Sequence, residues 1–74
     1  MTRKRAQEIA TANGLGAVHF QFNIAQNTGR TFEVGYVSVQ GVRALFCKRQ
    51  SYSSEDGFYL CNEFRGLEVV GAVA

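Results

Sequence analysis

Apolar and polar positions alternate most regularly between Thr31 and Arg49, and this pattern predicts a β-hairpin that turns at Gln40-Gly41. With a two-residue turn, apolar residues meet across the strands, opposite charges meet, and an aromatic ring covers the glycine of the first strand. The expected pairs on one face are Val39–Val42, Val37–Ala44, Gly35–Phe46 and Glu33–Lys48, and those on the other are Ser38–Arg43, Tyr36–Leu45, Val34–Cys47 and Phe32–Arg49.

A second alternating segment, from residue 17 to residue 25, predicts a half-buried strand that precedes the hairpin. The polar residues 27–30 predict the turn between the two. This connection is expected to pair Phe22 with Gly35, Phe20 with Val37 and Val18 with Val39. The apolar side of the strand then continues the apolar side of the hairpin.

At the start of the chain, residues 2–13 predict a short helix with Thr2 as its N-cap and Gly14 just beyond its last turn. The three cations at positions 3–5 oppose the helix dipole in the first turn. They are either a basic arm kept for an anionic partner or a solvated helix start.

Residues 54–73 allow two interpretations. Alternation from Phe58 to Phe64 predicts a fourth strand, followed by a turn at Arg65-Gly66 and a fifth strand over 67–73. The rival interpretation is a helix from Ser54. Because Phe, Tyr, Cys, Asn and Gly are poor helix formers, we favour the strands.

These elements predict an α+β fold in a single small domain, residues 1–74, with a basic helix in 1–14 and a five-stranded antiparallel meander in 17–73. One short helix cannot cover the apolar face of such a sheet. We therefore expect either a small SH3-like or Sm-like barrel or a homodimer packed face to face. The apolar face comprises Val18, Phe20, Phe22, Ile24, Val37, Val39, Val42, Ala44, Phe46, Phe58, Leu60 and Phe64.

The charge of the chain is concentrated near its start. The formal net charge is +2, from 8 Lys and Arg against 6 Asp and Glu. Residues 3–5 hold three of the cations, so the rest of the chain carries five cations against six acids, about −1. A weakly acidic body argues against a general polyanion binder. We find no signal peptide or membrane-spanning stretch and expect a cytoplasmic protein with reduced thiols.

Only His19, Cys47 and Cys61 suit nucleophilic or transition-metal chemistry. Their spacing is long and unlike that of a zinc site, so we expect no metal, no cofactor and no catalysis. The two cysteines are expected to lie close together on the second face of the sheet without forming an essential disulfide.

The second face of the predicted sheet gathers aromatic residues and arginines, which are enriched at binding hot spots and also suit base stacking. It could equally be the solvated side of an antiparallel sheet. The candidate partner-binding residues are Phe32, Tyr36, Arg43, Arg49, Tyr59 and Arg65, and the secondary basic arm comprises Arg3, Lys4 and Arg5.

We expect a small non-catalytic binding protein that inhibits or adapts a protein partner. Small domains without an active site are typical of phage or mobile-element inhibitors of host machinery. The alternative is a small nucleic-acid-binding domain that uses the same face together with the basic arm.

Overall fold

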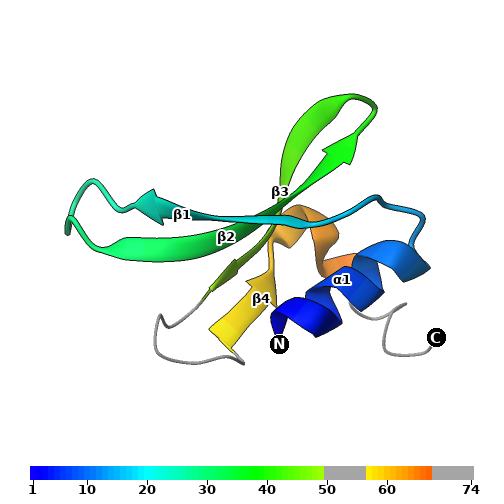
Figure 1. Cartoon of the computed structure of the whole chain (residues 1–74), viewed down its shortest axis with the longest axis horizontal. Coiled ribbons are helices and arrows are strands. Elements are labelled where there is room, and N and C mark those ends of the chain that lie inside the picture. The colour runs from blue at the N-terminus through cyan, green and yellow to red at the C-terminus, as the bar shows by residue number, and fades with distance from the viewer. Residues whose placement is uncertain (50–56, 68–74) are drawn as a thin grey trace.

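The computed structural model describes residues 1–49 and 57–67, which form one helix and an antiparallel sheet (Figure 1). The strands follow one another as a meander in the order β1-β2-β3-β4, so β1 and β4 are the two edges and the sheet is open. This confirms the α+β class, whereas the barrel is not formed by the described residues. The elements are α1 (Arg3–Ala12), β1 (His19–Ile24), β2 (Thr31–Val39), β3 (Val42–Arg49), β4 (Phe58–Leu60) and the short 3-10 helix η2 (Asn62–Phe64).

Helix α1 begins and ends as the sequence predicts. The Thr2 hydroxyl accepts a hydrogen bond from the Arg5 N–H at 3.1 Å and caps the first turn. Gly14 follows the helix with φ +73°, a conformation that glycine adopts without strain. The helix buries Ala6, Ile9 and Ala10; the two alanines let it lie close to the sheet, and Ile9 fills the space between them.

The β2–β3 turn is also as predicted. Gln40 and Gly41 have φ of 52° and 78°, so both central residues are left-handed, as in a primed turn that matches the twist of a hairpin. The four expected pairs next to the turn are confirmed: Val39–Val42, Ser38–Arg43, Val37–Ala44 and Tyr36–Leu45.

Further from the turn the predicted register is wrong, because the hairpin contains a β-bulge. Gly35 pairs with Cys47 and Val34 with Lys48, so Phe46 is the extra residue of β3. The bulge lets the Phe46 ring enter the core, where it is fully buried and lies edge-to-face against Phe64 at 5.1 Å. Gly35 has no side chain, which leaves room for the sulfur of Cys47 above it.

The bulge exchanges the two faces for the last part of β3. The expected pairs Gly35–Phe46, Glu33–Lys48, Val34–Cys47 and Phe32–Arg49 are therefore not formed. Cys47 and Arg49 point to the same side as α1, whereas Lys48 points to the opposite side. We call the side of the sheet that packs on α1 the inner face and the opposite side the outer face.

Strand β1 pairs with β2 two residues away from the expected register. Phe20 lies opposite Gly35 and Phe22 opposite Glu33. The loop spans residues 26–29 instead of 27–30, because the Ala25 N–H bonds to the Arg30 carbonyl at 2.8 Å and closes the connection one position earlier. A shift of two preserves the faces, so the expected apolar side of β1 is on the inner face.

Neither interpretation of residues 54–73 holds throughout. Strand β4 ends at Leu60, the Cys61 N–H bonds to the Phe46 carbonyl at 3.0 Å, and residues 62–67 are helical. The turn at Arg65-Gly66 is thus not formed. Apart from Leu67, which is helical, the expected fifth strand lies outside the described residues.

The core lies between α1 and the inner face, and its uneven extent leaves part of that face open. Figure 1 shows α1 beside β4, whereas the far end of the β1–β2 hairpin and the β2–β3 turn extend beyond the helix. Phe22, Ile24 and Val42 are accordingly 55%, 69% and 66% exposed. The core cluster comprises Ala6, Ile9, Ala10, Val18, Val37, Phe46, Cys47, Phe58 and Leu60.

Candidate binding surface

The outer face presents aromatic and basic side chains together with neutral polar ones. None of its residues within the described ranges is Asp or Glu, because the one acidic strand residue there, Glu33, points to the inner face. By strand alternation, the outer face comprises His19, Gln21 and Asn23 of β1, Phe32, Val34, Tyr36 and Ser38 of β2, Arg43, Leu45 and Lys48 of β3, and Tyr59 of β4.

A closed network holds Tyr36 and Arg43 in place on this face. The guanidinium carbon of Arg43 lies 3.8 Å from the centre of the Tyr36 ring, which is a cation–π contact. Arg43 Nη2 also donates a hydrogen bond to Gln21 Oε1. Gln21 Nε2 donates to Asn23 Oδ1 at 2.9 Å, and Asn23 Nδ2 donates to the Tyr36 hydroxyl at 3.3 Å. The aromatic ring and the cation are therefore fixed before any partner arrives.

A second cation–aromatic pair lies on the same face. Lys48 Nζ is 4.6 Å from the centre of the Phe32 ring. Val34 lies between Phe32 and Tyr36 along β2 and is only 1% exposed, so the larger side chains around it cover it without help from α1. The outer face is thus a second packed layer with cations at its surface.

A shallow hollow of about 330 Å³ borders the Tyr36–Arg43 pair. Tyr59 lies across β3 from this hollow, opposite Lys48 in the register, and is 37% exposed. The hollow is lined by His19, Gln21, Tyr36, Val37, Ser38, Gly41 and Arg43.

Of the six predicted partner-binding residues, the structure brings Phe32, Tyr36, Arg43 and Tyr59 together on the outer face. The placement of the other two was wrong. Arg49 lies on the inner face because of the bulge, and Arg65 follows η2, where its Nε donates to Asn62 Oδ1 at 3.1 Å. Lys48 was not among the predicted residues, because the bulge that moves Arg49 to the inner face also moves Lys48 to the outer face. Gln21 and Asn23 alternate with the apolar residues of β1, so their face was predictable, but their bonds to Arg43 and Tyr36 were not.

The inner face holds a buried carboxylate between two arginines. Glu33 is 3% exposed, and its carboxylate accepts from Arg3 Nη2 at 2.5 Å and lies 3.3 Å from Arg49 Nη2. The side chain of Arg49 is 12% exposed, whereas that of Arg3 is 56% exposed. A paired carboxylate of this kind ties the start of α1 to β2 and β3.

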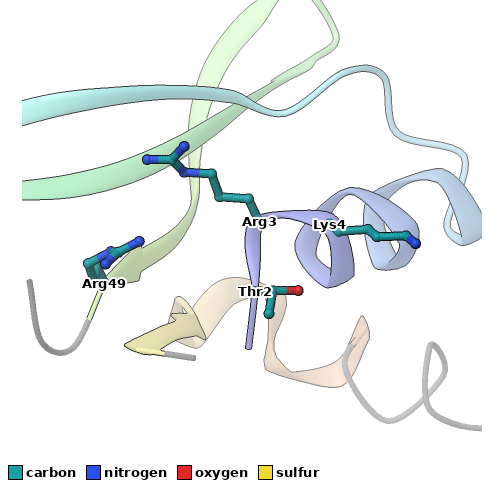
Figure 2. Close-up of a pocket in the computed structure, with 4 residues that line it drawn as sticks. All are labelled: Thr2, Arg3, Lys4 and Arg49. Atoms are coloured by element: carbon teal, nitrogen blue, oxygen red, sulfur yellow. The ribbon is translucent and has the colours of Figure 1, made fainter. Parts of the chain in front are cut away.

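A basic hollow of about 390 Å³ lies at the start of α1 and is lined by Thr2, Arg3, Lys4 and Arg49. Figure 2 shows that Arg3 extends toward the sheet, whereas Lys4 extends in the opposite direction, so the two side chains do not converge. Arg3, moreover, contacts Glu33. The basic arm of residues 3–5 is therefore partly engaged in the fold, and we do not choose it as the candidate site.

The cysteines are both free and both held as thiols. Burial raises the pKa of Cys47 from 9.0 to about 12, and the neighbouring Cys61 adds to this shift. Burial and then Glu63 raise the pKa of Cys61 as well. His19 is on the outer face and Cys47 on the inner face, so they lie on opposite sides of the sheet. Within the described ranges, no three His, Cys, Asp or Glu side chains gather as a metal site.

Comparisons with family models, curated proteins and solved structures find no match to this chain. No helix within the described residues is long and apolar enough to cross a bilayer.

Proposed function

We propose that this chain is a small non-catalytic binding protein whose outer sheet face engages an acidic surface of a protein partner, which it inhibits or adapts. The observation that carries the proposal is the presence of two cation–aromatic pairs, Arg43 on Tyr36 and Lys48 on Phe32, on either side of Val34 on a face whose described residues include no carboxylate. Tyrosine and arginine are the residue types most enriched among binding hot spots.

Pre-organisation supports this function. A flexible arginine loses side-chain entropy on binding, roughly 0.5–1.5 kcal/mol for each immobilised side chain. The Tyr36 ring and the Gln21 amide already restrain Arg43, so much of that cost is met during folding. The fixed guanidinium still has donors beyond its bond to Gln21, and these suit a carboxylate.

The charge distribution supports an acidic partner. The two cations of the outer face are separated by the sheet from the nearest strand carboxylate, Glu33, which is paired with arginines on the other side. Among the described strand residues, no carboxylate therefore neutralises the positive charge of the outer face. An acidic partner would be attracted to it, and the rate of association would fall with salt.

Nucleic acid is the second candidate, because the same uncompensated cations would also attract phosphates. The cation–aromatic contacts on this face favour a protein partner over nucleic acid. One side of the Tyr36 ring is occupied by Arg43, and Phe32 carries Lys48 in the same way, so a base would have to displace a cation in order to stack.

An affinity capture from the native cell, identified by mass spectrometry, tests the proposal when it is run with matched variants. Arg43→Ala is compared with Arg30→Ala, which removes the same charge from an exposed position directly before β2. We expect Arg43→Ala to weaken binding of the captured protein by about thirtyfold, as for a hot spot of roughly 2 kcal/mol. Arg30→Ala should bind as wild type does.

Two results would contradict this proposal. If both variants bind the captured protein equally well, the outer face is not the site. If the chain captures nucleic acid and its affinity falls steeply with salt in a titration, the second candidate function replaces the first.

A further inference from the structure

The two edges of the sheet differ in how their backbone groups are satisfied. At the β4 edge, the Phe58 N–H donates to the Met1 carbonyl at 3.2 Å, and the Met1 amino group donates to the Phe58 carbonyl at 2.6 Å. Met1 therefore occupies this edge as a strand residue would. At the other edge, no described element pairs with β1 on the side away from β2.

The direction of the backbone groups of β1 follows from its pairing with β2. The bond from the Ala25 N–H to the Arg30 carbonyl sets the phase, so Asn23 and Gln21 direct their backbone groups toward β2. Phe20 and Ile24 alternate with them and direct their N–H and C=O groups away from the sheet. Such an edge is a template for another strand.

The side chains of β1 carry none of the features that usually protect an edge. Protected edges carry lysine, proline or inward-pointing charges. The chain has no Asp, Glu, Lys or Arg between Glu8 and Arg30, and it has no proline at all. On the inner face beside the edge, Phe22 and Ile24 are 55% and 69% exposed, so apolar surface flanks the open backbone.

We propose that β1 pairs antiparallel with β1 of a second copy of this chain, around a twofold axis at Phe22. In that register Phe20 faces Ile24 of the second copy on the inner side, and Gln21 faces Asn23 of the second copy on the outer side. Apolar residues meet apolar residues and neutral polar residues meet each other, with no charge opposed. The outward backbone groups of Phe20 and Ile24 all find partners in this arrangement.

The self-complementarity of β1 selects a second copy as the occupant. A twofold interface uses the same patch on both chains, so each pair must work in both directions. β1 meets this condition because the sequence reads apolar, polar, apolar, polar, apolar from Phe20 to Ile24, symmetrically about Phe22. The resulting sheet is continuous, with four strands from each chain, and it places both outer faces on the same side. If the proposed function holds, the dimer would present two binding faces to one partner assembly.

The experiment measures the mass of the full chain by light scattering after size exclusion, over a range of concentrations. Wild type is expected to give twice the 8.2 kDa of one chain. Ile24→Lys adds a charge beside the edge and should give the monomer mass. The matched control is Val42→Lys, at a residue with almost the same exposure on the same face but on β3, and it should remain a dimer. Both positions are exposed, so both variants should fold.

Amide exchange followed by NMR distinguishes edge pairing from face-to-face packing. The Phe20 and Ile24 amides should be protected in wild type and should exchange fast in Ile24→Lys. A wild-type monomer at all concentrations would overturn the proposal. So would a dimer that Val42→Lys disrupts and Ile24→Lys does not, or a dimer with unprotected Phe20 and Ile24 amides. Protection of these amides only when a foreign protein is bound would replace the second copy with an extended strand of that protein.

Discussion

Substituting Gly35 by alanine tests the bulge and the packing around it directly. A Cβ on Gly35 would lie 2.6 Å from Cys47 Sγ and 2.8 Å from Val18 Cγ1. Ordinary contacts between such atoms are about 3.5–4.0 Å, so both side chains would have to retreat by roughly 1 Å. Both are buried in the core, where space for this movement is scarce.

Overpacking of this kind costs about 1–3 kcal/mol. The lower entropy of the unfolded alanine chain returns about 0.4–1 kcal/mol. We therefore expect Gly35→Ala to lower the free energy of unfolding by about 1.3 kcal/mol, the difference at the middle of these two ranges, and the melting temperature by roughly 5–10 °C for a domain of this size. The control is Gly16→Ala, where the new Cβ meets nothing within 4 Å, and its stability should change by less than about 0.5 kcal/mol.

A double-mutant cycle identifies the atom responsible. Cys47→Ala removes the sulfur that the new Cβ would meet. In Gly35→Ala/Cys47→Ala the loss of stability, measured by urea unfolding, should be smaller than the sum of the two single losses by at least about 0.5 kcal/mol. If the two losses simply add, or if Gly35→Ala is as stable as wild type, Cys47 does not lie above Gly35 and the bulged register is wrong.

Three further predictions concern stability. Glu33→Gln should lower the free energy of unfolding by about 3 kcal/mol, because it leaves the guanidinium of Arg49 buried beside a neutral group. Urea unfolding measures this change, and a negligible loss would contradict the prediction. Because burial raises the pKa of Cys47 from 9.0 to about 12, the folded thiol holds its proton more tightly than the unfolded one. This difference adds to the free energy of unfolding; the contribution is fully present below pH 9 and is lost as the pH rises toward 12. Wild type should accordingly lose more stability than Cys47→Ala between pH 8 and pH 11, and parallel losses would contradict this. Gly41→Ala should cost about 1 kcal/mol in thermal melting, since φ of 78° strains alanine, and an unchanged melting temperature would argue against the primed turn.

The candidate binding residues should behave differently from the core. Tyr36→Ala should change stability far less than Phe46→Ala, because Tyr36 is partly exposed on the outer face whereas Phe46 is fully buried. A core phenylalanine truncated to alanine typically costs about 3–5 kcal/mol. Thermal melting of the two variants checks this, and an equal loss would mean that the outer face is a second core and not a binding surface.

The local elements of this protein follow from residues that are close together in the chain. The cap at Thr2, the stop at Gly14 and the turn at Gln40-Gly41 depend on residues that are neighbours in the chain, so their chemistry can be read directly. The turn also fixed the four nearest pairs of the hairpin, because successive residues on the two strands pair in order, starting from the turn. Four of the six candidate binding residues followed from that alternation.

Beyond those four pairs, the register of the hairpin depends on tertiary packing. The bulge at Phe46 depends on how a ring fits between α1 and the sheet, and neither the turn nor the alternation carries that information. A single extra residue then exchanged Lys48 and Arg49 between faces, which moved one cation onto Phe32 and the other onto Glu33. Side chains alternate between the two faces with a period of two, so one inserted residue changes the face of every residue that follows in the strand, and the composition of the candidate binding surface changes with it.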